Sequence, residues 1–364
     1  MVIDVHCHIG FSAKRADPNI QRFSFEQNGA AGHAGFDSYF SPRLIARPAW
    51  FFVRRWLGVD PRLKPGDALD AAIESIYEKH WSQMPSVDRL VLLAFDEYHD
   101  DDGCVIGPAG RFQKRGSDIY SSNSFVAAYC RTNPNRYLFG ASLHPYRVYE
   151  GRSAPDLLVE LAASSPRPSL IKWLPIHQNI RADDPRTIAF LRRAAELKIT
   201  ILVHYGGEMS LSRQHMEFEH PGPMLGVLRK LRTESAMPTV IVAHLATPSF
   251  PWQSADGFNM LAEALTGEFR EAPLYADISA LAAFGRTSWL PHLAERADLQ
   301  RKVVWGTDFP IPVMFMPYWR HLDRTTRRRI AAIPSWVEQD FQLKKAFNLQ
   351  PEVFTRAAEI LRVS

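Results

Sequence analysis

The sequence of 364 residues predicts an α/β fold, a (β/α)8 TIM barrel. Short apolar segments alternate with amphipathic helical segments eight times along the chain. Several of these segments are apolar almost throughout, as expected for parallel strands that are buried on both faces. No glycine fingerprint follows the first strand, which counts against a dinucleotide-binding sheet and favours a closed barrel.

The eight expected strands are short runs of apolar residues bounded by polar or turn-forming residues. The second strand reads VDRLVLLAF, the fifth ITILVH and the sixth TVIVAH. In chain order the strands cover residues 2–8, 87–95, 137–143, 169–174, 199–204, 239–244, 274–279 and 302–308.

The expected helices carry apolar residues three and four positions apart. In the first helix these include Leu69, Ile73 and Ile76, and the second helix ends before Pro134 because the residue before a proline avoids the helical conformation. The helices between strands cover residues 67–81, 123–132, 155–163, 185–197, 223–232, 258–266 and 290–297. A last amphipathic helix at 351–361 is expected to cover the bottom or the side of the barrel.

Two segments are too long for ordinary connections, which rarely exceed about 15 residues. They are about residues 9–66, after the first strand, and about 309–348, after the eighth. Both are expected as insertions on the C-terminal face of one barrel domain that spans residues 1–364. The first insertion is rich in aromatic residues, and we expect either a lid over the barrel mouth or a dimer contact.

Composition and charge argue against several classes of protein. Lysine and arginine number 43 against 39 acidic residues, a net charge of +4 that is spread along the chain, whereas nucleic-acid binding needs a concentrated basic face. The densest basic run, residues 324–329, is interpreted as a solvated helix face. Arginines in and beside residues 50–57 rule out a membrane-spanning helix there. We therefore expect a small-molecule substrate and neither a nucleic-acid nor a membrane partner.

The cysteines indicate the cellular compartment. Cys7, Cys104 and Cys130 are odd in number and fit no zinc or redox spacing. Reduced thiols in a cytoplasmic protein are the simplest account. The first residues read as a strand rather than as a signal peptide, which agrees with a cytoplasmic location.

Polar residues stand on or at the ends of several expected strands, and the C-terminal ends of barrel strands converge on one mouth. They are, in chain order, His6, His8, Lys172, His204, His244 and Asp308. The i, i+2 spacing of the first pair puts both imidazoles on one face of a strand. A lone histidine at a strand end is more often a hydrogen-bonded structural residue. Four positions of this kind, each at the C-terminal end of an expected strand, favour a metal site instead.

Further motifs surround these strand ends. They are Asn123-Ser124-Phe125-Val126, Pro134-Asn135-Arg136-Tyr137, Ile171-Lys172 and Trp305-Gly306-Thr307-Asp308-Phe309-Pro310. Together with the histidine pattern, they resemble the amidohydrolase superfamily, and in particular its amidohydrolase-2 branch, which includes aminocarboxymuconate semialdehyde decarboxylase. The resemblance spans about residues 1–361 apart from the two insertions. Its motifs are specific for the family but much less so for a reaction.

The resemblance implies that His6, His8, His204 and Asp308 hold a divalent ion, most often zinc, with manganese as the alternative. It also implies that His244 stands beside the ion as a catalytic group. The residue types agree, because three imidazoles and one carboxylate suit zinc, and a bound ion makes hydroxide available near neutral pH. Asp308 could accept the proton of the water and later deliver it to the leaving group. His244 could hydrogen-bond the hydroxide or a developing oxyanion.

Lys172 leaves the number of ions open. In binuclear relatives a lysine on the fourth strand is carbamylated and bridges two metals. In many amidohydrolase-2 proteins it contacts the substrate or a carboxylate instead. A cation beside a metal is costly unless it is neutralised or paired. We expect one ion, or two if Lys172 is carbamylated.

Weaker candidates follow the third to fifth strands and could reach the mouth. Arg213 is favoured for a substrate carboxylate, because a guanidinium binds a carboxylate through two parallel hydrogen bonds. The others are His177, Tyr205, His144, Glu208, His215 and His220. The acidic segment 96–103 is interpreted as a solvated loop, although residues 96–99 stand where substrate contacts are expected.

The sequence favours a metal-dependent hydrolase that uses a metal-activated water on a carboxylic ester, lactone or amide of a small molecule. The alternative is a metal-dependent, non-oxidative decarboxylase of an aromatic or unsaturated acid, since the resembled branch contains both. Lys172 and the lack of a recognisable decarboxylase-specific loop favour hydrolysis. A non-catalytic binding barrel has no need of His244 beside an open metal position. The aromatic first insertion suggests an apolar or aromatic substrate, and homodimers are common in the family.

Overall fold

The computed structural model describes residues 1–26 and 35–363. Residues 27–34, part of the predicted first insertion, and residue 364 lie outside the described residues. Within the described ranges, no helix is both long enough and apolar enough to cross a membrane.

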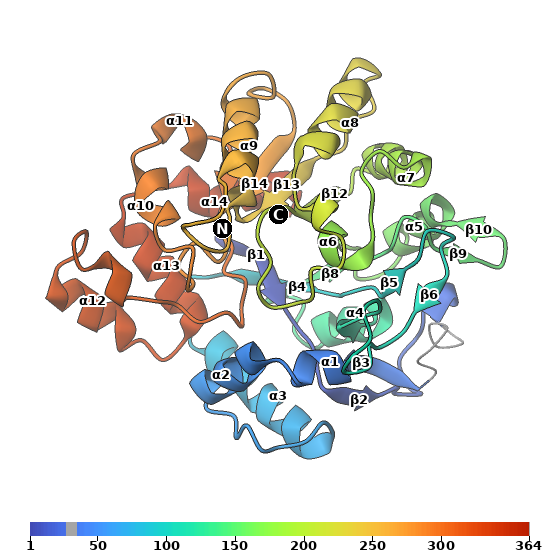
Figure 1. The fold of residues 1–364 in the computed structure, drawn as a ribbon, viewed down its shortest axis with the longest axis horizontal. Coiled ribbons are helices and arrows are strands. Elements are labelled where there is room, and N and C mark those ends of the chain that lie inside the picture. The colour runs from blue at the N-terminus through green and yellow to red at the C-terminus, as the bar shows by residue number, and fades with distance from the viewer. Residues whose placement is uncertain (27–34, 364) are drawn as a thin grey trace.

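Eight parallel strands form one sheet, and their order in the sheet is their order along the chain. They are β1 (Ile3–His8), β4 (Arg89–Leu93), β8 (Tyr137–Ala141), β11 (Leu170–Trp173), β12 (Thr200–His204), β13 (Val240–Ala243), β14 (Leu274–Asp277) and β15 (Val303–Val304). The strands lie at the centre of the molecule with the helices around them (Figure 1). The eight predicted strands are therefore confirmed within the described residues, but β15 is much shorter than the predicted 302–308.

Backbone hydrogen bonds join the two edges of this sheet. After β15 the chain continues beside β1, where the amide of Asp308 donates to the carbonyl of His6 at 2.8 Å. The amide of His8 donates to the carbonyl of Phe309 at 2.9 Å, and Cys7 and Phe309 form a parallel bridge. The sheet thus curls round on itself, and its last position is filled by an extended segment rather than by a regular strand.

The helices between the strands, and the last helix of the chain, agree closely with the prediction. They are α3 (Asp67–Ser82), α4 (Asn123–Thr132), α5 (Ala154–Ala162), α7 (Pro185–Glu196), α8 (Gly222–Thr233), α9 (Asp256–Thr266), α10 (Trp289–Ala294), α11 (Ala297–Gln300) and α14 (Glu352–Ile360). Side-chain caps fix several of their starts. The hydroxyl of Ser122 accepts from the amide of Phe125 at the start of α4, and Asp184 accepts from the amide of Arg186 at the start of α7.

Alternate residues of the strands pack into two separate apolar layers. The outer layer joins the strands to the helices, as Trp173 and Phe190 illustrate. The inner layer gathers residues such as Leu202 and Ile241, together with Ala357 and Ile360 of α14. The contacts of α14 with β1 and β15, and its place in the inner layer, agree with the expectation that this helix covers the barrel.

A register shift in β1 changes which side chains face the inside. Ile3 and Val5 belong to the inner layer, whereas Cys7 belongs to the outer one, and the pairing of β1 with β4 shifts between Asp4 and Cys7. Because a shift of one residue moves side chains to the other face of a strand, it turns His6 and His8 towards the interior.

The first insertion contains regular structure that its sequence did not indicate. It holds β2 (Ala13–Arg15), β3 (Phe36–Phe40), α1 (Pro42–Ile45) and α2 (Pro48–Leu57), and β2 and β3 form a small sheet with β7 (Ile119–Ser121). The second insertion holds α12 (Arg324–Ala331) and α13 (Trp336–Ala346). The short strands and the α-helix that remain are β5 (Tyr98–His99), β6 (Val105–Ile106), β9 (Val148–Tyr149), β10 (Arg152–Ser153) and α6 (Pro175–Gln178). Single 3-10 turns lie at Ser24–Glu26, Met216–Phe218, His244–Ala246 and Met316–Tyr318.

Candidate metal centre and active site

His6, His8 and Asp308 form one cluster at the end of β1. Nε2 of His8 lies 3.1 Å from Oδ1 of Asp308, and Nε2 of His6 lies 3.4 Å from the same oxygen. Each of the three residues offers one ligand atom, and these atoms all lie within 4.8 Å of one another. Asp308 has a φ of 66°, a left-handed conformation that is costly for a residue with a side chain and is concentrated at functional sites.

His204 and His244 lie beside this cluster. The ring of His244 stacks on that of His6 at 5.0 Å between centroids, and the ring of His204 lies 4.8 Å from that of His244. Nε2 of His204 lies 3.3 Å from the carbonyl oxygen of Gly207 and 3.7 Å from Oε2 of Glu208. The four residues expected to hold a metal therefore meet at one place. The ligand atoms of His6, His8 and Asp308 lie close enough together to hold one ion, and His204 lies beside them.

The backbone around His244 orients its ring. His244, Leu245 and Ala246 have φ values of 54°, 53° and 52°, three left-handed residues in succession directly after β13. The amide of His244 donates to Oδ1 of Asp277 at 2.8 Å, and Nδ1 lies 2.9 Å from the carbonyl oxygen of Ser279. Because a carbonyl can only accept, Nδ1 carries the proton in this contact and Nε2 is left as an acceptor. Burial lowers the pKa of His244 to about 3, so the ring is neutral.

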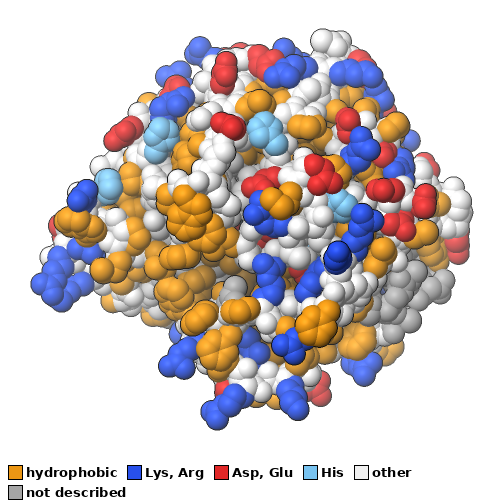
Figure 2. Space-filling view, in the orientation of Figure 1, with side chains coloured by type: hydrophobic (Ala, Val, Ile, Leu, Met, Phe, Trp, Pro, Cys, Tyr) orange, Lys and Arg blue, Asp and Glu red, His pale blue; other side chains and the backbone are white. Residues whose placement is uncertain are grey.

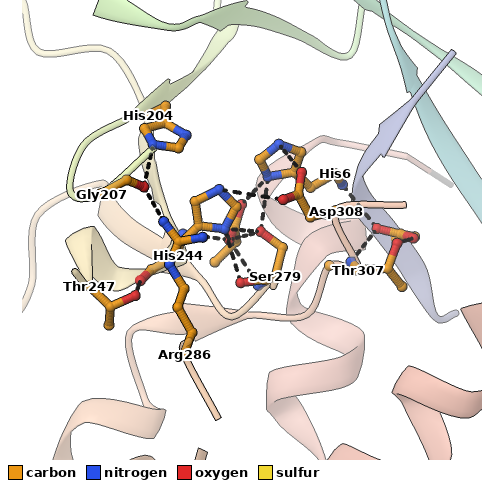
Figure 3. A network of polar contacts seen from close by, with 12 residues as sticks. His6, His204, Gly207, His244, Thr247, Ser279, Arg286, Thr307 and Asp308 are labelled. Atoms are coloured by element: carbon orange, nitrogen blue, oxygen red, sulfur yellow. Dashed lines mark hydrogen bonds and ion pairs between the residues drawn. The ribbon is translucent and has the colours of Figure 1, made fainter. Parts of the chain in front are cut away.

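Asp277 fixes the orientation of His6 from behind. Its Oδ2 lies 2.8 Å from Nδ1 of His6, which leaves Nε2 unprotonated and facing Asp308. Burial alone would raise the pKa of Asp277, but the hydrogen bonds from His6 and Ser279 help to hold it well below its usual range. Burial, reinforced by the charge of Lys172, lowers the pKa of His6 to about 4. The hydroxyl of Ser279 links both rings, at 3.0 Å from Nδ1 of His6 and 2.8 Å from Nδ1 of His244 (Figure 3).

Lys172 reaches the same cluster from β11. Its Nζ lies 3.0 Å from Nε2 of His6, and the side chain is 2% exposed. Burial lowers the pKa of Lys172 to about 8, although the charges of Asp277 and Asp308 act in the opposite direction. The lysine thus contacts the nitrogen that His6 would offer to a metal.

Arg286 is a buried cation at the site that the sequence did not single out. One terminal nitrogen donates to the carbonyl of Gly207, and the side chain runs past His244 (Figure 3). The residue is 6% exposed, and its Nε has no hydrogen-bond partner among the described residues. Burial lowers the pKa of Arg286, while the charge of Glu208 opposes this shift.

These residues line one cavity of about 810 Å³. At its inner end are His6, His8, Lys172, His204, Glu208, His244, Arg286 and Asp308. Burial raises the pKa of Glu208, which was among the weaker sequence candidates. The rest of the wall is mainly apolar and includes Phe40, Trp50, Phe52, Trp56, Phe95, Phe284 and Ile311. Residues of the first insertion therefore form part of the wall that faces the histidines.

Arg213, His177 and Tyr205 lie away from this cavity. The guanidinium of Arg213 is bound to Glu219, so the substrate contact favoured for it has no support here. His177 is fully buried, with Nδ1 3.1 Å from the carbonyl oxygen of Ser212. Tyr205 lines a separate hollow of about 430 Å³.

The other weak histidine candidates also lie elsewhere. His215 and His220 line the same separate hollow as Tyr205. His144 is fully buried, and its Nε2 lies 2.8 Å from the carbonyl oxygen of Gln178. A position shortly after a strand is therefore not enough to predict that a histidine lines the cavity.

The prediction of a solvated acidic loop was wrong for its first half. Asp96, Glu97 and His99 are buried, whereas Asp101 and Asp102 are exposed. The guanidinium of Arg147 forms a buried ion pair with Asp96, which removes that carboxylate from solvent and from the cavity.

The donor set fits a divalent ion. His6 is neutral and has its proton directed to Asp277, so its Nε2 lone pair faces the site, where Nζ of Lys172 contacts it. Asp308 has a pKa well below its usual range although its burial favours the neutral form. Burial likewise lowers the pKa of His204. Neutral imidazoles with an ionised carboxylate are ligands that zinc and manganese accept.

Comparison with known proteins gives one family and several solved structures. Residues 3–331 match the family model Amidohydro_2, described as "Amidohydrolase". No curated protein sequence matches the chain significantly. An uncharacterised TIM-barrel protein from Bordetella bronchiseptica is 14% identical, with a TM-score of 0.57 over 99% of this chain and 98% of that one. This similarity identifies the fold as a TIM barrel.

Two further structures have lower scores. A probable 2-pyrone-4,6-dicarboxylic acid hydrolase from Acinetobacter baumannii is 11% identical, with a TM-score of 0.47 over 99% of each chain. A 5-carboxyvanillate decarboxylase from Sphingomonas paucimobilis is 13% identical, with a TM-score of 0.46 over 100% of this chain and 99% of that one.

Proposed function

The chain belongs to the amidohydrolase-2 family, and from this premise we propose that it is a metal-dependent hydrolase of a carboxylic ester, lactone or amide bond in a small molecule. We also propose that residues 1–364 act as one barrel domain, with the first insertion contributing to the substrate cavity. The enzymes of this family are typically metal-dependent, and the grouping of His6, His8 and Asp308 supports the same requirement here.

His6, His8, His204 and Asp308 would hold the ion in this proposal. A bound divalent ion would polarise a substrate carbonyl and lower the pKa of a nearby water. Asp277 directs the proton of His6 away from the site, and Ser279 and the left-handed turn at His244 hold the second ring. These contacts keep the donor atoms in place before substrate arrives.

The remaining steps belong to groups of the chain. Nε2 of His244 is an acceptor and can take a hydrogen bond from the attacking water, which orients the water lone pair towards the carbonyl carbon. Asp308 accepts the water proton and delivers it to the leaving oxygen or nitrogen. Arg286 is placed to donate to the oxyanion that develops on the carbonyl. The net reaction adds water across the bond and gives an acid and an alcohol or amine.

The observation that carries hydrolysis is the position of Asp308. Its Oδ1 contacts the two histidines of β1, while its Oδ2 faces Nε2 of His244 at 3.9 Å. The carboxylate of Asp308 thus stands between the candidate ligands His6 and His8 and the ring of His244, which would orient the water. Hydrolysis needs a group at this place that takes a proton from the water and then gives one to the leaving group.

A second candidate is the non-oxidative decarboxylation of an aromatic or unsaturated acid. The buried cations Lys172 and Arg286 in one cavity favour a substrate that carries a carboxylate. In that reaction the carbon–carbon bond to the carboxylate breaks, carbon dioxide leaves, and a proton replaces it on the substrate carbon.

The deciding experiment has two stages. Elemental analysis of protein purified without added metal or chelator is expected to give about one zinc or manganese per chain, or two if Lys172 is carbamylated. The protein is then offered aryl esters, lactones and amides on one side and hydroxybenzoic acids on the other. Ester or lactone cleavage without carbon dioxide release supports hydrolysis, and the reverse supports decarboxylation.

The matched variants are Asp308→Asn and Asp298→Asn. The first is expected to lower kcat by at least about 100-fold, because proton transfer is lost. The second replaces an exposed aspartate that pairs with Arg296, and it should leave kcat unchanged. If the protein contains no metal and takes none up on titration, both candidate functions are rejected.

A further inference from the structure

The cavity joins two chemically different ends. Its inner end holds the histidine cluster and Arg286, and its outer wall is formed by aromatic side chains of α2 and of the segment that carries Phe284. Phe52, Trp56 and Phe284 line the cavity and yet remain 65%, 51% and 59% exposed. A ligand that covers large apolar side chains in such a position removes their surface from water, which makes its binding more favourable. Figure 2 shows hydrophobic side chains gathered over α2 and the segments next to it.

We infer that the substrate is an amphiphile, with its hydrolysable group at the histidine cluster and an extended alkyl or aryl group along Phe52, Trp56 and Phe284. This inference rests on the proposed function and deepens it. A cavity of about 810 Å³ is far larger than a single ester or lactone group requires. The additional space is apolar and continuous with the reactive end, so the part of the substrate that fills it is apolar as well.

The helix that forms this wall is held in place by its neighbours. Trp50, at its first turn, packs against Phe40 of β3 with 5.2 Å between ring centroids. A terminal nitrogen of Arg47, just before the helix, donates to the carbonyl of Met209 at 3.3 Å, which connects α2 to the segment after β12. The aromatic wall is therefore fixed relative to His204 rather than attached loosely at the mouth.

The arginines of α2 favour a single amphiphilic molecule over a lipid surface. A helix that binds anionic membranes presents free basic side chains beside its apolar face. Arg54 instead donates to the carbonyls of Asp60 and Leu63 at 2.8 and 2.7 Å. Arg55 lines the cavity. The basic side chains of this helix are thus directed to the protein and to the cavity, where a single anionic or polar ligand would meet them.

Binding of product analogues tests this inference without requiring turnover. Hydrolysis of an acyl ester leaves a carboxylate, so the probes are butanoate, hexanoate and octanoate, titrated into the intact protein by isothermal calorimetry. Each added methylene is expected to tighten binding by up to about fourfold, the free energy of one buried CH₂ group. The kcat/KM values of matching p-nitrophenyl esters should rise with the same slope.

Three variants of one helix locate the effect. Phe52→Ala and Trp56→Ala should reduce the dependence on chain length and weaken octanoate binding several-fold, with little change for butanoate. Phe51→Ala is the control, because Phe51 is 47% exposed on the same helix but does not line the cavity. This variant should bind all three probes as the wild type does.

The outcomes separate this inference from the proposed function. Binding that depends on chain length without any ester cleavage supports the apolar subsite and argues against hydrolysis. Ester cleavage with affinities that do not depend on chain length overturns the amphiphile inference and leaves hydrolysis standing. Binding to anionic phosphatidylserine vesicles, weakened equally by Phe51→Ala and Phe52→Ala, would replace the single ligand with a membrane surface and also overturns it.

Discussion

Glu97 is a buried carboxyl group outside the cavity that holds the histidine cluster. The hydroxyl of Tyr39 donates to its Oε1 at 2.8 Å, while its Oε2 has no hydrogen-bond partner among the described residues. Burial raises the pKa of Glu97 to about 7, even though the charge of Arg147 lowers it. The folded protein therefore holds a proton on this group at a pH where the unfolded chain has released it.

The stability of the protein should depend on pH through this residue. A carboxyl pKa raised from its ordinary value of 4.5 to about 7 means that the folded state binds more protons between these values, so stability falls as pH rises through that window. Relative to Glu97→Gln, the wild type should lose about 3 kcal/mol between pH 4.5 and pH 7.5. Urea unfolding of both proteins across this range measures the difference, and a constant difference would contradict the assignment.

Tyr39→Phe provides a second check on Glu97. It retains the carboxyl group but removes the hydroxyl donor, which stabilises the charged form. The pH window of the stability loss should then move to higher pH. A variant whose window is unchanged would show that another group titrates.

Single residues show why the sequence predicts that certain side chains lie in one cavity. His6, His8, His204, His244 and Asp308 could be brought together because each stands at the end of an expected strand, and strand ends meet at one mouth. The same rule, applied to the seventh strand, would have found Asp277 and Ser279. Arg286 follows no such rule, because it reaches the cavity from a loop whose path depends on tertiary packing.

Among the elements, the segment after β15 depends on α13. The indole nitrogen of Trp305 donates to Oδ1 of Asp340 at 2.9 Å, and Nζ of Lys344 donates to the carbonyl of Gly306 at 2.9 Å. Lys344 and Asp340 also pair with each other at 2.6 Å in a fully buried position. The segment that leads to Asp308 is thus held by Asp340 and Lys344, which lie one turn apart on α13 and form an ion pair with each other.

Removing one partner of this pair should destabilise the protein strongly. Lys344→Met leaves Asp340 buried without a counter-charge, a change that costs about 3–5 kcal/mol. Lys345→Met is the matched control at the next position, where the side chain is exposed, and it should change stability by less than about 0.5 kcal/mol. Denaturant unfolding at pH 8 compares the two. Equal losses would mean that helix propensity, rather than the buried pair, accounts for the effect.

The elements also show why some predictions from sequence fail. Buried parallel strands such as β12 and β13 consist mainly of apolar residues and are recognised easily. β15 is short because the segment after it pairs with β1 only through isolated bonds, a detail that the sequence does not encode locally. β2 and β3 were not expected because the sheet that they form is completed by β7 at residues 119–121, a distant part of the chain that pairs with β3.

At the scale of the whole molecule, the candidate ligands connect the beginning of the chain to its later part. Removal of the metal is therefore expected to lower Tm, since a ligand that binds only the folded state stabilises it by about 3 kcal/mol at a hundredfold excess over Kd. Differential scanning calorimetry with chelator, and again after zinc is added back, measures the shift. Asp308→Asn should abolish most of this dependence on metal. An unchanged Tm with chelator in the wild type would contradict metal binding at this site.

The closure of the sheet has a consequence for how the protein matures. His8 and Asp308 are 300 positions apart in the sequence. During synthesis His6 and His8 are therefore made long before Asp308, with which they form the cluster. Until residues 305–309 dock on β1, that strand is an uncovered edge, the kind of surface on which nascent chains associate wrongly. If the proposed site holds a metal, its capture is therefore a late event in folding, because it needs Asp308 docked beside β1.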